Sequence, residues 1–157
     1  MIKIKKILCP TDFSTPSIEA LKIANDMALS YSAKLYIVNI VTPVPLLSAP
    51  PAFTTSGIPG SIDLVAYRKS LEESAKTELE KLLKKSVSKK IKAVPIIAYG
   101  DAAEQILNIA DKEKIDLVVI ATHGRTGWKH FVFGSVAEKV IRLAKQPVLT
   151  IRKPNNQ

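Results

Sequence analysis

Two short runs rich in β-branched and apolar residues, 35–41 and 115–121, constrain the fold of this chain more than any other feature. Such runs are typical of strands that are buried on both faces, as in a parallel sheet. Segments in which apolar residues recur at helical spacing separate these runs, so strands and helices alternate from end to end. Parallel strands joined by helical crossovers form a sheet that helices cover on both faces. We therefore predict a doubly wound α/β fold with a five-stranded parallel sheet.

The alternation also predicts where each element lies. The strands are expected at residues 2–9, 34–41, 92–98, 116–121 and 147–151. The helices are expected at residues 14–32, 63–86, 101–112 and 135–144. Ser14 is the expected N-cap of the first helix, and Asp101 with Glu104 is expected to open the third. Residues 42–62 hold five of the ten prolines and no charge, which predicts a long flexible loop.

Length, charge and cysteine content limit the class of protein. A chain of 157 residues is near the usual size of one domain. The net charge of +9 favours anionic partners, although the same lysines could simply keep the protein in solution. Cys9, the one cysteine, lies in an apolar run, so we expect a buried, unreactive thiol. No apolar run approaches the roughly 20 residues of a membrane span, and the N-terminus lacks a signal-peptide core, so a cytoplasmic location is expected.

The residues with chemical character follow the first and fourth strands. The first strand leads into Pro10-Thr11-Asp12, and the fourth leads into IATHGRTG at residues 120–127. Ligands of doubly wound sheets bind at the carboxyl ends of strands where the strand order reverses. Glycines allow close approach to the backbone, and the helix that Gly134-Ser135 opens offers amides to an anion. The alternative is a glycine-rich turn in which Ser135 and Glu138 form a capping box.

These segments resemble the universal stress protein family (UspA-like), in particular its ATP-binding subgroup. Residues 6–14, KILCPTDFS, and the segments 117–127, 134–138 and 147–151 carry the resemblance, which spans the whole chain. The family's nucleotide-binding pattern is Gly-x2-Gly-x9-Gly-Ser/Thr, and this sequence reads Ala121-x2-Gly124-x9-Gly134-Ser135. The spacing fits the pattern. The methyl group of the alanine that replaces the first glycine would crowd the ligand slightly.

The resemblance implies a single domain, the strand order 3-2-1-4-5, and a site for ATP (or AMP or ADP) with Mg²⁺ or Mn²⁺ bridging the phosphates. The residues it brings to the nucleotide are Pro10, Thr11, Asp12, Ile40, Ile120, Ala121, His123, Gly124, Arg125, Gly134, Ser135 and Val136.

Within this set the resemblance assigns roles. Thr11 and Asp12 would lie against adenosine, with Asp12 accepting from a ribose hydroxyl or contacting the base. Ile40 would meet adenine through its backbone. The end of the fourth strand would line the ribose and the α-phosphate, and the residues from His123 onward, including the start of the last helix, would surround the phosphates.

The expected activity is regulation rather than strong catalysis. The sequence has no Walker lysine, no defensible Ser-His-Asp set and no Cys/His cluster at metal spacing. We therefore expect an ATP-binding, stress-response protein with at most slow ATP hydrolysis. The alternative is a nucleotide-free homologue that acts as a protein-interaction module, a hypothesis that gains if Ala121 blocks the pocket. A response-regulator domain is disfavoured because no aspartate ends the third strand.

The last strand predicts how copies of the chain associate. It would be an apolar edge of the sheet, and such edges invite pairing. The resemblance implies a homodimer through this strand, formed by Val148, Leu149, Thr150 and Ile151. A membrane partner is not expected, and neither is a nucleic-acid partner, because no aromatic residues interleave the lysines of the second helix.

Overall fold

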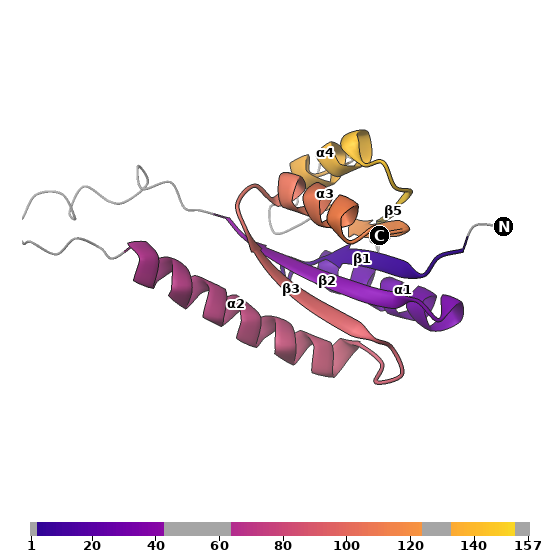
Figure 1. The fold of residues 1–157 in the computed structure, drawn as a ribbon, viewed down its shortest axis with the longest axis horizontal. Coiled ribbons are helices and arrows are strands. Elements are labelled where there is room, and N and C mark those ends of the chain that lie inside the picture. The colour runs from indigo at the N-terminus through magenta and orange to yellow at the C-terminus, as the bar shows by residue number, and fades with distance from the viewer. Residues whose placement is uncertain (1–2, 43–63, 124–132, 153–157) are drawn as a thin grey trace, which may run out of the picture.

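The strands of this protein form one parallel sheet in the order β3-β2-β1-β4-β5, which confirms the predicted fold class and strand order (Figure 1). The structure, a computed structural model, describes residues 3–42, 64–123 and 133–152. The strands are β1 (Lys6–Pro10), β2 (Lys34–Val41), β3 (Ala93–Tyr99), β4 (Leu117–Ala121) and β5 (Val148–Ile151). The helices are α1 (Thr15–Tyr31), α2 (Leu64–Ser86), α3 (Ala102–Lys112) and α4 (Ser135–Leu143). The expected loop at 42–62 lies almost wholly outside the described residues.

The predicted bounds agree with the structure to within one residue for every element except β1. The prediction was wrong there, because β1 begins at Lys6 and runs through Pro10 instead of spanning 2–9. Proline fits the end of a strand, since its fixed φ is compatible with extended backbone and only its missing N–H limits pairing.

Two apolar layers fill the space between the sheet and its helices. One lies between the sheet and α1 with α2, and the other lies between the sheet and α3 with α4 (Figure 1). The central strand β1 supplies both layers, Ile7 and Cys9 to the first and Leu8 to the second. Burial raises the pKa of the Cys9 thiol to about 12, so the thiol stays protonated and unreactive, as expected.

Helix α2 packs on the sheet along only part of its length. Ala75, Leu79 and Leu82 are buried, whereas Tyr67, which shares their helical spacing, is 49% exposed. Figure 1 shows the first turns of α2 reaching past the carboxyl ends of the strands, and Arg68 lies there over the ring of Tyr99, the last residue of β3, at 4.0 Å. No helix among residues 3–42, 64–123 and 133–152 combines the length and hydropathy that a bilayer crossing requires.

Candidate functional site

Strand β1 separates from its two neighbours at different points. Its pairing with β2 continues to Pro10 opposite Val38, and the Thr11 N–H donates to the Val38 carbonyl at 2.8 Å. Its pairing with β4 ends already at Leu8 opposite Val118. Backbone N–H and C=O groups point to the two neighbouring strands in turn. The Thr11 N–H points to β2, so the backbone nitrogen of Pro10 points to β4, and proline has no N–H with which to continue that ladder. The sheet therefore opens between β1 and β4 at its carboxyl edge, where the strand order reverses.

A cavity of about 290 Å³ lies at this opening. Every described residue of the predicted site lines it: Pro10, Thr11, Asp12, Ile40, Ile120, Ala121, His123, Gly134, Ser135 and Val136. Gly124 and Arg125 lie outside the described residues. The structure therefore brings the two crossovers together around one cavity, while the contacts of these residues with a ligand stay a prediction. The same cavity is lined by residues that the sequence interpretation missed, namely Ser17, Ala102, Ile106, Thr122 and Ala137.

The turn between β1 and α1 is held by its own side chains. The Asp12 carboxylate accepts a hydrogen bond from the Ser14 N–H at 3.0 Å and another from the Ser14 hydroxyl. The buried Thr11 hydroxyl lies 3.0 Å from the Ser17 hydroxyl and accepts from the Phe13 N–H at 3.1 Å. Phe13 has φ of 64°, a left-handed conformation that is uncommon for a side chain of this size. These bonds fix the turn, so Asp12 is held at the wall of the cavity.

The crossover between β4 and α4 is closed at its base by one backbone bond. The Gly134 N–H donates to the Thr122 carbonyl at 2.7 Å, and the Thr122 N–H donates to the Ile151 carbonyl of β5 at 3.0 Å. The Thr122 hydroxyl lies 2.9 Å from His123 Nδ1. A Cβ added to Gly134 would lie 3.4 Å from the Thr122 carbonyl oxygen. A side chain at this position would therefore be in ordinary van der Waals contact with the end of β4.

The helices that begin at the cavity differ in how their N-termini are capped. The Ser14 side chain accepts from the Ser17 N–H in α1, and the Asp101 side chain accepts from the Glu104 N–H at 2.9 Å in α3. Helix α4 has Gly134 as its N-cap and makes no side-chain capping bond. The alternative of a capping box formed by Ser135 and Glu138 does not match the structure, because Ser135 is the first helical residue and not the cap. No side chain of the described residues therefore caps the first amides of α4, and free amides at a helix start suit an anion.

The end of β2 offers backbone groups to the same cavity. The Lys34 N–H donates to the Lys5 carbonyl, just before β1, and the Val38 carbonyl accepts from the Thr11 N–H, just after β1. By alternation, the N–H and C=O of Ile40 also face the β1 side, whereas the Val41 carbonyl accepts from Gly100 on the β3 side. In the described part of the chain, no backbone hydrogen bond reaches Ile40 from the β1 side. Ile40 thus presents a donor and an acceptor where β1 has left the sheet.

Comparison with known proteins bears on this arrangement. The family model described as the universal stress protein family matches residues 3–152. Universal stress protein MJ0531 of Methanocaldococcus jannaschii is 35% identical over 98% of this chain and 85% of its own length. Universal stress protein YxiE of Bacillus subtilis is 30% identical over 94% of this chain and 98% of its own length.

Solved structures agree with the fold. The structure of the M. jannaschii protein MJ0577 is similar with a TM-score of 0.80 and 27% identity, covering 99% of this chain and 100% of that one. A universal stress protein in complex with cAMP shares the fold with a TM-score of 0.60 and 22% identity over 95% of this chain and 97% of that one. The universal stress protein from Archaeoglobus fulgidus in complex with dAMP has a TM-score of 0.57 and 19% identity, covering 96% of this chain and 99% of that one. The chain described here belongs to the universal stress protein family.

Proposed function

We propose that this chain binds ATP in the cavity at the carboxyl edge of the sheet and acts as an ATP-dependent regulator in a stress response. One observation carries the proposal: the uncapped start of α4 and the outward-facing backbone of Ile40 line the same cavity. The first suits a phosphate chain and the second suits the edge of a base. A nucleotide joins these two chemical groups in one ligand.

The base would bind at the β2 side of the cavity. Adenine carries an amino donor next to a ring-nitrogen acceptor, which complements a backbone C=O and N–H from one residue. Pro10, Ile40 and Ile106 line the cavity and offer apolar surface to the faces of the ring. The fixed carboxylate of Asp12 would accept from a ribose hydroxyl.

The phosphates would bind at the start of α4. The amides of Ser135 and Val136 open this helix, and each charge–dipole contact there contributes roughly 0.3–1 kcal/mol. Among the described residues, no cluster of three or more His, Cys, Asp or Glu could hold a metal ion. A bound Mg²⁺ or Mn²⁺ would therefore be held chiefly by the phosphate oxygens. AMP and ADP would use the same base and ribose contacts with fewer phosphate contacts.

Regulation fits this cavity better than turnover. His123 Nδ1 lies at hydrogen-bond distance from the Thr122 hydroxyl, and the Asp12 carboxylate is engaged by Ser14. Neither group is poised as a strong general base toward a water molecule. We therefore propose at most slow ATP hydrolysis, with nucleotide occupancy as the signal.

The alanine at position 121 bears on the alternative of a nucleotide-free interaction module. Ala121 lines the cavity and is 8% exposed. The cavity keeps about 290 Å³ with this methyl group in place, near the roughly 300 Å³ at which ligand pockets begin. The observation supports nucleotide binding over the alternative. The complexes of structurally similar proteins with cAMP and dAMP support the choice of an adenine nucleotide.

Calorimetric titration with ATP and Mg²⁺ tests the proposal, with GTP and Mg²⁺ as the matched control ligand. We expect one ATP per chain and at least about 10-fold weaker binding of GTP, because guanine reverses the donor and acceptor that face Ile40. Equal affinity for the two nucleotides would contradict the base contact. No heat with either, together with no nucleotide in mass spectra of freshly purified protein, would contradict the function.

We also propose that two copies pair through β5. This strand is an edge of the sheet, and Leu149 on it is 36% exposed. Apolar edge strands favour pairing with a second chain. Light scattering at micromolar concentration should give the mass of a dimer, and a monomer mass there would contradict the pairing.

A further inference from the structure

A buried amide side chain interrupts the apolar run of β2. Asn39 is 7% exposed, between Val38 at 0% and Ile40. A buried polar side chain requires a hydrogen-bond partner, because an unsatisfied one is costly. The Asn39 Nδ2 donates to the Thr11 carbonyl at 2.8 Å, across the boundary between β2 and the β1–α1 turn.

This bond occupies the acceptor that the next backbone bond of the sheet would use. In a parallel ladder, the N–H of residue i donates to the carbonyl of residue j on the next strand. The carbonyl of residue i then accepts from the N–H of residue j+2. The Thr11 N–H donates to the Val38 carbonyl at 2.8 Å, so the following bond would run from the Ile40 N–H to the Thr11 carbonyl. That carbonyl is instead bound by the Asn39 side chain.

We propose that Asn39 is a positioning residue that ends the β1–β2 ladder and so keeps the Ile40 N–H and C=O available to the base of a ligand. The role toward a ligand rests on the proposed function, but the effect on the backbone does not. The same bond holds the Thr11 carbonyl one residue before Asp12, so Asn39 fixes both the base and the ribose contacts. Asn39 itself is not among the residues that line the cavity, and its effect passes through Thr11 and Ile40.

Removal of the amide should let the ladder extend. In Asn39→Leu and Asn39→Ala, the Thr11 carbonyl loses its donor, and the Ile40 N–H is the nearest backbone group in register to replace it. Leucine keeps the number and branching of the side-chain heavy atoms and is not smaller, so this variant guards against a loss of folding through a cavity. Asn25→Ala is the matched control. The Asn25 Oδ1 accepts from the Ser88 N–H at 2.9 Å, which is an asparagine–backbone bond outside the cavity.

The first readout is amide hydrogen exchange by NMR without nucleotide. We expect fast exchange of the Ile40 N–H in the native protein and at least about 10-fold slower exchange in Asn39→Leu and Asn39→Ala, with no change in Asn25→Ala. An Ile40 amide as protected as that of Val38 in the native protein would overturn the inference. Unchanged exchange in both Asn39 variants would also overturn it.

The second readout is ligand affinity. ATP should bind at least about 10-fold more weakly to both Asn39 variants, and the preference for ATP over GTP should shrink, because the base loses its backbone partners. Tripolyphosphate, which has no base, should bind as it does to the native protein. An equal loss for ATP and tripolyphosphate would overturn the positioning role. If neither the native protein nor any variant binds ATP, the proposed function is wrong. The exchange experiment then still decides whether Asn39 ends the β1–β2 ladder.

Discussion

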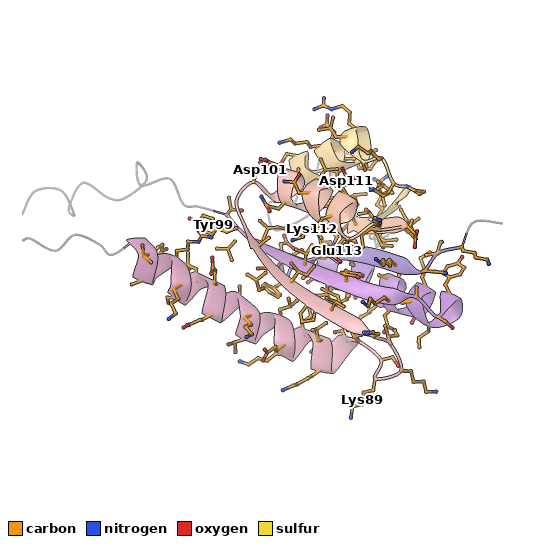
Figure 2. All side chains as sticks on the ribbon, viewed as in Figure 1. Lys89, Tyr99, Asp101, Asp111, Lys112 and Glu113 are labelled. Atoms are coloured by element: carbon orange, nitrogen blue, oxygen red, sulfur yellow. The ribbon has the colours of Figure 1, made fainter. Side chains whose placement is uncertain are left out.

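Helices α3 and α4 pack against each other and both begin at the cavity, yet they begin in different ways. The first turn of α3 is capped by Asp101, whose carboxylate accepts from the Glu104 N–H and also from Lys139 Nζ of α4 at 3.1 Å. The first turn of α4 follows Gly134 and has no side-chain cap. Figure 2 shows Asp101 at the start of α3 and Asp111 further along the same helix.

The difference separates a helix end that is capped within the chain from one that, on the proposed function, binds a phosphate. The N-terminus of α3 is satisfied within the chain, and the hydrogen bond from Glu104 followed by that from Lys139 lowers the pKa of Asp101. In the described part of the chain no side chain caps the N-terminus of α4, so on the proposed function its amides would bind the phosphates. A side-chain cap stabilises a helix but competes with a phosphate for the same amides, and an uncapped end gives up that stability to keep a binding site.

The largest effect should follow from giving α4 a cap like that of α3. In Gly134→Asp the backbone at φ −73° and ψ 157° suits an aspartate cap. The new carboxylate would bind the first amides of α4 and repel phosphate. We expect ATP affinity to fall at least about 100-fold, since charge-assisted bonds to several phosphate oxygens are lost. Calorimetry measures the affinity, and the unfolding temperature should stay equal or rise.

Two variants isolate the cause of that effect. Gly134→Ala adds a Cβ without a cap or charge and should lower ATP affinity far less than Gly134→Asp. Asp101→Ala removes the cap of α3 and should lower the unfolding temperature by about a few degrees while ATP affinity changes less than about twofold. If Asp101→Ala weakened ATP binding as much as Gly134→Asp, the contrast between the two helix ends would be wrong.

A smaller effect on ATP affinity is expected at Ala121, the last residue of β4 and part of the cavity wall. Ala121→Gly restores the glycine of the family pattern and removes a methyl group from the cavity wall. ATP should bind about two- to fivefold more tightly because the ligand can approach the backbone more closely. Competition between ATP and a fluorescent analogue would measure the gain. A loss of affinity would mean that the methyl group contacts the ligand favourably.

The smallest effect is the pH dependence of the two ends of α3. The pKa of Asp101 is lowered as described, and hydrogen bonds from Lys145 and then Gln146 lower the pKa of Asp111. A carboxyl whose pKa is lowered by folding stabilises the protein above its unfolded pKa of about 3.9, and this stabilisation is lost as the pH falls through the folded pKa. Both groups are solvent-exposed, so the effect is small.

Thermal unfolding between pH 5 and pH 3 measures this effect. The native protein should lose slightly more stability over that range than the double variant Asp101→Asn with Asp111→Asn, because asparagine does not titrate. Identical slopes for the two proteins would show that neither aspartate is coupled to folding.

Most of the fold could be predicted from the sequence because apolar periodicity decides which faces are buried. Residues 35–39 of the apolar run at 35–41 are buried, and the capping residues Ser14 and Asp101 mark true helix starts. The start of β1 could not be predicted, since alternating lysines suit both a strand and an exposed arm. The alternative in which Ser135 caps α4 could not be excluded from the sequence, because capping depends on backbone direction, which spacing does not reveal.

The candidate site could be predicted only for residues close to a motif. Asp12 and His123 come two residues after the ends of β1 and β4, so the rule for carboxyl ends of strands finds them. Ala102 and Ile106 reach the cavity because α3 packs beside α4, and no local signal in the sequence marks that packing. Asn39 did carry a signal, because it is a polar residue within an apolar run, but its partner Thr11 lies 28 positions away.

A crystal structure of this chain with ATP and Mg²⁺ tests the central claim most directly. We predict phosphate oxygens within hydrogen-bond distance of the Ser135 and Val136 amides and the edge of adenine on the Ile40 N–H and C=O. A nucleotide bound elsewhere, or one in this cavity whose phosphates do not contact the start of α4, would contradict it.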